Sequence, residues 1–225
     1  MAREFADDDW EGIFLREAVR ATNKDSVVLD AGCGTNEYLR YLEKRFGLGI
    51  DIEPWPEAKG ASFVVAALES IPLKDDCCNV VITHSVLEHL KEPAAVVKEV
   101  SRILRKDGLL IFATSHRYHF ASLAASIVPW TSFKSRLAGF KVYRTYYRCN
   151  TVRSIREIFV NGGLLEVRLV RTYDPALLTL GLRLLLWPLN QLYRSRLAHL
   201  MPPHHLVGVF VKSRGSVDIQ GILGT

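Results

Sequence analysis

The residues best suited to bind a ligand lie in the stretch VVLDAGCGTNE, residues 27–37, where an acid precedes two closely spaced glycines. Val27–Asp30 is a short apolar run typical of a buried parallel strand, so Gly32 and Gly34 would form a tight turn at the end of that strand. A turn of this kind, followed by a helix, directs backbone N–H groups towards a ligand. The stretch therefore predicts a nucleotide-binding loop.

The residue at position 37 distinguishes between two kinds of nucleotide. The dinucleotide pattern G-x-G-x-x-G, when set on Gly32, requires a glycine where this chain has Glu37. A carboxylate there would repel a pyrophosphate, which argues against NAD or FAD. Asp30 would instead suit a ligand that carries an ammonium group, such as an amino-acid tail, or would accept hydrogen bonds from the loop amides. The loop is thus predicted to bind a nucleotide joined to an amino acid.

Five sequence blocks in a fixed order link the chain to a known family. They are LDAGCGT (29–35), GIDIEP (49–54), LESIPL (68–73), NVVITHSVLEHL (79–90) and EVSRILRKDGLL (99–110). With these blocks the chain resembles the class I S-adenosylmethionine-dependent methyltransferases, in particular the methyltransferase type 11 group, over about residues 25–115. The resemblance implies S-adenosylmethionine as the cofactor and transfer of its methyl group to a small-molecule acceptor.

The resemblance also implies roles for single residues. Gly32 and Gly34 would lie under the methionine part of the cofactor, with Asp30 organising the loop. Asp51 would hold both ribose hydroxyls, since a carboxylate offers paired acceptors, and Leu68 with its neighbours would border the adenine ring. The complete set expected to bind the cofactor is Asp30, Gly32, Cys33, Gly34, Asn36, Asp51, Ile52, Ala67, Leu68, Glu69, His84 and Ser85.

Two positions depart from the family pattern. Ala67 stands where the family usually has an acid that meets the adenine amino group, and Glu69 is close enough to replace that acid. Asn36 stands where the family usually has a third glycine, and asparagine tolerates left-handed backbone angles, so we expect a positive φ at Asn36. Because of these departures, a methyltransferase-like binding or scaffold protein without activity is kept as an alternative.

The catalytic candidates follow from the chemistry of the transfer. Displacement of a methyl group from a sulfonium needs mainly positioning and dry surroundings, and a hydroxyl acceptor would also need a general base. His84, which with Ser85 would face the methyl group, is the first candidate, and His116 is the second because both follow strand ends. Tyr146 or Tyr147 could help from an insert.

The same residues have structural interpretations that stay open. Asp30 could cap the following turn, Asp51 could be a solvated acid at a strand end, and His84 could be a partly buried histidine. Cys33 could be a small buried residue. The pair Glu88-His89 is interpreted as ordering the segment after the fourth strand.

Helical and strand patterns alternate along the chain. The expected strands are 27–30, 48–51, 62–66, 79–84, 109–114, 164–171 and 206–212. The expected helices are 10–22, 93–104, 151–161 and one that runs from the end of the glycine loop to about residue 46. With the resemblance, this order predicts an α/β fold: a Rossmann-like, doubly wound, seven-stranded and mostly parallel sheet with helices on both faces and a C-terminal antiparallel strand. The ligand crevice should lie at the carboxyl ends of the first strands. A single domain, 1–225, would carry inserts at 116–150 and 175–203.

Charge is divided unevenly along the chain. Residues 1–115 hold 14 basic and 20 acidic residues, a net of −6, whereas residues 116–225 hold 15 and 4, a net of +11. The basic half suggests an anionic membrane surface, an anionic substrate or nucleic acid, or only a solvated basic surface. Nucleic acid is disfavoured because no separate binding module or base-methylation motif is present.

The segment 175–203 leaves several partners open. It is strongly apolar, but Arg183 and Pro188 interrupt it and make it too short and too charged to span a bilayer. It could lie in a membrane interface, cover a lipophilic substrate, contact a second copy of the chain or pack as a core helix. A membrane-associated interaction module is therefore a further alternative function, and a lipophilic or glycan-linked molecule is the expected acceptor.

The compartment is inferred from the cysteines and the first residues. The four cysteines show no disulfide framework and no Cys/His cluster with zinc spacing, so no metal is expected. The stretch MAREFADDDW is acidic and unlike a secretory signal. We expect a cytoplasmic protein, peripheral at the membrane if residues 175–203 bind lipid.

Overall fold

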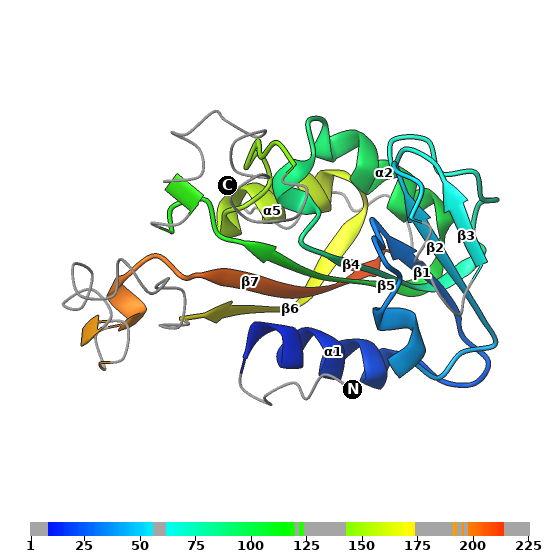
Figure 1. The fold of residues 1–225 in the computed structure, drawn as a ribbon, viewed down its shortest axis with the longest axis horizontal. Helices are drawn as coiled ribbons and strands as arrows, with labels where there is room; N and C mark the ends of the chain where they lie inside the picture. The colour runs from blue at the N-terminus through cyan, green and yellow to red at the C-terminus, as the bar shows by residue number, and fades with distance from the viewer. Residues whose placement is uncertain are drawn as a thin grey trace, which may run out of the picture.

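The computed structural model describes residues 9–55, 62–119, 122–123, 143–173, 191–192, 195 and 198–213. Within these residues a seven-stranded sheet runs through the middle of the molecule in the order β3-β2-β1-β4-β5-β7-β6 (Figure 1). The strands are β1 (Val27–Ala31), β2 (Phe46–Asp51), β3 (Ser62–Val65), β4 (Cys78–His84), β5 (Leu104–Ser115), β6 (Leu164–Thr172) and β7 (His205–Lys212).

The direction of the strands matches the predicted fold. Every neighbouring pair from β3 to β5 is parallel, and β7 is antiparallel to both β5 and β6. The strand order reverses between β1 and β4, and in open α/β sheets ligands bind outside the carboxyl ends of the strands at such a switch point. The Rossmann-like prediction is confirmed, and the place to look for a site is the end of β1 and β4.

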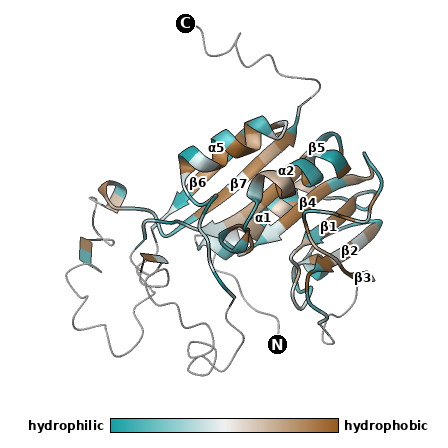
Figure 2. Cartoon of the chain, turned by 90° about the horizontal axis from the view of Figure 1, so that it is seen from above, coloured by the Kyte–Doolittle hydropathy of each residue, from teal (hydrophilic) through white to brown (hydrophobic). Residues whose placement is uncertain are grey.

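Helices cover the two faces of the sheet. The helix α1 (Trp10–Ala21) packs on one face, and α2 (Pro93–Ile103) with α5 (Val152–Asn161) packs on the other. Three short 3-10 turns are η1 (Tyr38–Tyr41), η2 (Leu87–His89) and η3 (Ala198–Leu200). Each long helix has a hydrophobic side towards the sheet and a hydrophilic side away from it, which is plain for α5 in Figure 2.

The helix boundaries follow ordinary capping chemistry. Asp9 caps α1 by accepting a hydrogen bond from the Gly12 amide. Thr151 and Ser154 form a reciprocal capping box at the start of α5. Gly163, with φ of 84°, turns the chain after α5 towards β6.

The core is split by the sheet into two layers, because successive residues of a strand face opposite sides. Val28, Val80 and Ile82 pack with Phe14 under α1, whereas Leu29, Val81 and Phe112 pack with Phe159 under α2 and α5. Burial of one such large side chain contributes about 2 kcal/mol. The alternation also decides which face each residue at the strand ends will occupy.

The predicted helix from the glycine loop to about residue 46 is wrong. Only the turn η1 forms, and the Lys44 ammonium donates to the carbonyls of Leu39 and Leu42 where a further turn would have continued. Arg45 N–H already bonds to the Ser26 carbonyl as β2 begins. The chain therefore pairs with β1 from residue 46 onwards, where the helix was expected to end.

A second difference concerns β5. The sequence predicts this strand at 109–114, but the strand begins at Leu104. Asp107 has φ of 62°, and the register with β4 shifts between Cys78 and Val80, so the added residues at the start of β5 contain an irregularity.

The two inserts lie mostly outside the described residues. Of 116–150, the structure describes 116–119, 122–123 and 143–150, and of 175–203 it describes 191–192, 195 and 198–203. The expected contacts of these inserts with membrane, substrate or a second copy stay predictions. No helix in the described part of the chain is long and apolar enough to cross a membrane.

Candidate active site

The glycine loop has the left-handed backbone that the sequence predicted. Gly32, Gly34 and Asn36 have φ of 77°, 50° and 59°. The amides of Gly32 and Cys33 both donate to the Ile50 carbonyl, at 2.7 and 3.1 Å, so the loop is joined to the end of β2. The expectation of a positive φ at Asn36 is confirmed.

Asn36 supports the loop from beneath. Its side chain is buried, and a Cβ added to Gly49 would lie 2.8 Å from the Asn36 Nδ2 atom. The close packing on the Gly49 backbone means that Asn36 fills the space between the loop and β2. Asn36 therefore contributes to the site by supporting the conformation of the glycine loop.

Asp51 is held at the end of β2 by backbone amides. Its Oδ2 accepts from the Gly34 N–H at 2.9 Å, and its Oδ1 accepts from the Glu53 N–H at 3.1 Å. These two bonds fix the plane of the carboxylate and leave it at the edge of a cavity. An acid in this position can accept further hydrogen bonds from paired hydroxyls.

Two cavities adjoin at the glycine loop, and Gly32, Gly34 and Trp55 line both of them. The Asp51 cavity, of about 400 Å³, has one wall made by Asp51, Ile52, Leu68 and Glu69. Its other wall is Ser85, Val86, His89, Leu90, Lys91, Tyr143 and Tyr146. The Asp30 cavity, of about 360 Å³, is lined by Glu11, Asp30, Cys33, Thr35, Glu37, Tyr38 and His84.

Asp30 is a buried acid at the bottom of the second cavity. It is 1% exposed, and its Oδ2 has no hydrogen-bond partner among the described residues. Burial, with a smaller effect of Asp51, raises the pKa of Asp30 to about 8. The carboxyl is therefore mostly protonated at neutral pH unless a cation lies beside it.

The raised pKa of Asp30 predicts a pH-dependent stability. The unfolded acid titrates near 3.8 and the folded one near 8, so the folded state binds more protons between these values. The free energy of unfolding should then fall as pH rises from about 4 to about 8, by up to about 1.4 kcal/mol per pH unit. Asp30→Asn should remove this fall, which urea unfolding at pH 5 to 8 measures. Parallel curves for the two proteins would contradict the assignment.

His84 lies in a row of aromatic rings on the α1 side of the sheet, as expected two residues beyond Ile82. Its ring stacks on Trp10 at 4.5 Å between centroids and lies 4.7 Å from Tyr38. Trp10 also stacks on His205 at 3.8 Å, and burial with neighbouring histidines lowers the pKa of His205 to about 2. The row fixes the imidazole of His84 beside the Asp30 cavity.

The other catalytic candidates do not line the Asp30 cavity with His84. Tyr146 lines the Asp51 cavity, and the Arg144 guanidinium lies 5.2 Å from its ring centroid. His116 is buried and lines neither cavity, and burial, with the nearby charge of Arg171, lowers its pKa. Tyr147 is buried as well, and its pKa is raised by burial. The structure thus does not gather the candidates around one reacting atom.

Glu88 joins the returning insert to the sheet. Its carboxylate accepts from Thr114 Oγ1 at 2.6 Å and from Ser115 Oγ at 3.4 Å, and Asn150 Nδ2 donates to the same Thr114 hydroxyl at 2.6 Å. The Glu88 carbonyl accepts from the Tyr146 amide at 2.7 Å. These contacts give Glu88 an ordering role, as interpreted from the sequence, and they set the position of Tyr146.

Comparison with known proteins agrees with this geometry. A family model described as a methyltransferase domain matches residues 29–112. A probable S-adenosylmethionine-dependent methyltransferase of Mycobacterium tuberculosis is 32% identical over 117 residues, which cover 48% of this chain and 42% of the relative. Over residues 29–112 the chain is therefore a methyltransferase domain. The predicted family and S-adenosylmethionine as its cofactor are thereby confirmed.

Two further proteins define the extent of the likeness. An uncharacterized protein of Methanocaldococcus jannaschii is 34% identical over 121 residues, 52% of this chain and 48% of that protein. The chain thus spans about half the length of the curated relatives it matches. An S-adenosylmethionine-dependent methyltransferase structure from Mesorhizobium loti has a TM-score of 0.61 and 16% identity, covering 91% of this chain and 99% of the other. At 16% identity this likeness shows only that the two proteins share a fold.

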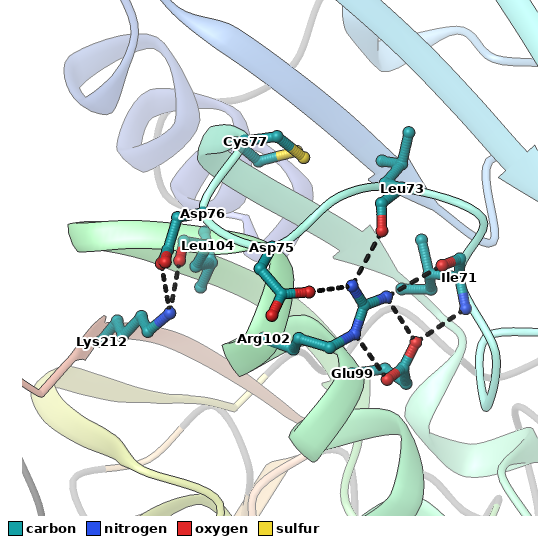
Figure 3. Close-up of polar contacts among 10 residues, drawn as sticks. Ile71, Leu73, Asp75, Asp76, Cys77, Glu99, Arg102, Leu104 and Lys212 are labelled. Carbon is teal, nitrogen blue, oxygen red and sulfur yellow. Dashed lines mark hydrogen bonds and ion pairs between the residues drawn. The ribbon is translucent and has the colours of Figure 1, made fainter.

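The segment that follows Leu68 and Glu69 is held by one arginine of α2, which contacts Ile71, Leu73 and Asp75 (Figure 3). The Arg102 guanidinium binds both oxygens of Glu99 at 2.8 Å and donates to Asp75 at 2.7 Å. It also donates to the carbonyls of Ile71 and Leu73, at 2.9 and 2.8 Å. This fork fastens the wall of the Asp51 cavity in the methyltransferase domain to α2.

Arg102→Lys is expected to destabilise the methyltransferase domain by about 1–2 kcal/mol, because an ammonium cannot reproduce the fork on Glu99 and the two carbonyls. Arg156→Lys is the matched control, since Arg156 also pairs bidentately with Glu166 but lies mostly exposed. The free energy of unfolding should fall by less than about 1 kcal/mol in Arg156→Lys. Urea unfolding measures both, and equal losses would show that the Arg102 fork adds nothing.

The methyltransferase domain places ten of the twelve expected cofactor residues at the two cavities. Asn36 lies beneath the loop, and Ala67 lines neither cavity. Sequence reasoning missed Glu11, Tyr38 and Trp55. Trp55 could have been found from its place four residues after Asp51, whereas Glu11 reaches the site only because α1 packs on the sheet.

Proposed function

We propose that this protein binds S-adenosylmethionine across the two cavities and transfers its methyl group to a small-molecule acceptor. The observation that carries the proposal is the Asp51 carboxylate, fixed by two backbone amides beside a glycine loop with left-handed φ angles. The donor and acceptor groups fit the cofactor. Asp51 suits a ribose diol, Leu68 and Ile52 suit a flat apolar base, and the buried Asp30 oxygen without a partner suits an ammonium group.

The two cavities divide the cofactor between them in this proposal. The adenosine part would occupy the Asp51 cavity, and the amino-acid tail would occupy the Asp30 cavity, with the shared loop beneath the junction. S-adenosylmethionine supplies a methyl group on a positively charged sulfur, already activated for displacement. The protein's residues then have to orient the partners and exclude water, rather than activate the methyl donor.

The acceptor would lie against the second wall of the Asp51 cavity. Val86 and Leu90 are aliphatic, Tyr143 and Tyr146 are aromatic, and Lys91 adds a positive charge at this wall. These side chains suit a small lipophilic acceptor, including one linked to a glycan, that carries a hydroxyl or an anionic group. Tyr146 is part of this wall and would meet an acceptor proton there, whereas His84 lies on the α1 side, beside the Asp30 cavity.

Transfer of label tests the proposed activity. The protein is incubated with S-adenosylmethionine labelled in the methyl group and with separate lipid, glycolipid and polar extracts from cells. Label should enter one extract with the wild-type protein and stay absent with Asp51→Asn. A wild-type protein that binds the cofactor but labels none of the extracts would support the inactive scaffold alternative instead.

A further inference from the structure

We propose that Glu11 of α1 completes the site for the ammonium group of the cofactor tail, which Glu11 and Asp30 bind together in the Asp30 cavity and through which the site selects its cofactor. This inference rests on the proposed function. It assigns a ligand-binding role to α1, since Glu11 lies outside the residues 29–112 that match the family model. The site would then be completed by a helix that packs on the sheet rather than by the matched domain alone.

Glu11 is held in place at the mouth of the cavity. Its Oε1 accepts from the Tyr38 hydroxyl at 3.2 Å and lies 3.9 Å from His84 Nε2. Its side chain is 20% exposed, and it lines the cavity. The preceding residue, Trp10, is stacked between the rings of His84 and His205. The start of α1 is therefore anchored on the sheet, and the Glu11 carboxylate has a fixed position.

Asp30 supplies the second carboxylate from the floor of the cavity. It lies one residue before the end of β1, it is 1% exposed, and its Oδ2 has no hydrogen-bond partner among the described residues. A buried polar atom without a partner costs free energy, and a donor supplied by a ligand would satisfy it. A cationic donor would in addition favour the ionised form of this carboxyl over the protonated one.

The charges around the cavity suit a cation. Glu11, Asp30 and Glu37 are its acidic residues, and no lysine or arginine occurs among the described residues that line it. The other titratable groups facing it are Cys33, Tyr38 and His84, with Asp51 across the loop. The carboxylate of an amino-acid tail would meet no basic lysine or arginine side chain of this lining, so the ammonium should provide most of the affinity of the tail.

Three ligands separate the contributions of the tail. S-adenosylhomocysteine has both groups, its decarboxylated analogue keeps only the ammonium, and its deaminated analogue keeps only the carboxylate. Calorimetry on the wild-type protein should show the decarboxylated analogue within about threefold of S-adenosylhomocysteine. The deaminated analogue should bind about 100-fold more weakly, the size expected for two lost charge-assisted hydrogen bonds.

Substitution of Glu11 tests the assignment to a residue. Glu11→Gln should weaken S-adenosylhomocysteine and the decarboxylated analogue about tenfold while leaving the deaminated analogue unchanged. Glu17→Gln is the control, because Glu17 lies on the same helix, pairs with Arg168 and lines neither cavity. Thermal unfolding of both variants confirms that α1 remains docked.

The outcomes separate this inference from the proposed function. If S-adenosylhomocysteine binds but the deaminated analogue binds as well as the decarboxylated one, ammonium selection is wrong and cofactor binding stands. If Glu11→Gln weakens all three ligands equally, Glu11 acts on the fold and not on the ammonium. If none of the three ligands binds to the folded wild-type protein, both proposals fail.

Discussion

Asp51→Asn is expected to weaken binding of S-adenosylhomocysteine about 100-fold. The substitution removes the charge that would strengthen two hydrogen bonds to the ribose, each worth about 1.5 kcal/mol or more. It also turns an amide N–H₂ towards the N–H of either Gly34 or Glu53, which both donate to Asp51 in the wild-type protein. Isothermal titration calorimetry measures the change.

Asp25→Asn is the matched control for this substitution. Asp25 is an exposed aspartate that precedes β1, at the opposite end of that strand from the site, and its loss changes the net charge by the same amount. Binding by this variant should equal that of the wild-type protein. If Asp51→Asn binds as tightly as Asp25→Asn, the carboxylate at the end of β2 is only a solvated acid, as the structural interpretation of the sequence allows.

Gly32→Ala is expected to destabilise the protein by about 2–5 kcal/mol and to abolish cofactor binding. Gly32 has φ of 77°, which costs an L-residue about 1–2 kcal/mol, and a Cβ there would lie 2.4 Å from Val86 Cγ2. Overpacking of this kind adds about 1–3 kcal/mol. Because Val86 lines the Asp51 cavity, relief of the clash would move a wall of the site.

Gly34→Ala separates the two causes. Gly34 also has a positive φ, of 50°, but a Cβ there would meet nothing within 4 Å. Its loss of stability should stay at about 1–2 kcal/mol, the backbone contribution alone. The double variant Gly32→Ala, Val86→Ala should recover the part of the loss that the clash causes. Equal unfolding free energies for Gly32→Ala and Gly34→Ala would show that contact with Val86 is unimportant.

Much of the fold follows from local signals in the sequence. Apolar runs bounded by turn residues identify β1, β2 and β4 within one or two residues, because these central strands are largely buried. The edge strand β3 is identified as closely, although it is mostly exposed. The antiparallel direction of β7 does not follow from alternation and was expected from the family resemblance. Its position between β5 and β6 was not predicted. The absence of a helix after the glycine loop could not be predicted. The apolar spacing that suggests a helix is a local signal, whereas the pairing of Phe46 with β1 is a contact between distant parts of the chain.

Two features of the candidate site follow from local properties of the sequence. Asn36 adopts its positive φ through an intrinsic tolerance of asparagine, and Asp51 follows directly from the end of a strand. Glu11 and His84 are different cases. His84 lies on the α1 side because alternate residues of a strand share a face, so that His84 points to the same side as Val80 and Ile82. This alternation can be counted in the sequence. Glu11 has no such signal, because only the docking of Trp10 on His84 and His205 brings it to the cavity.

The central claim is that one cofactor occupies both cavities around the glycine loop. Isothermal titration of the wild-type protein with S-adenosylhomocysteine, repeated at pH 6, 7 and 8 in buffers of different ionisation enthalpy, tests it most directly. The structure predicts one ligand per chain and release of a proton on binding, because a cationic tail ionises Asp30, whose pKa is raised to about 8 without it. Absence of binding at millimolar ligand to a folded protein would contradict the claim, and binding without proton release would contradict the place given to the tail.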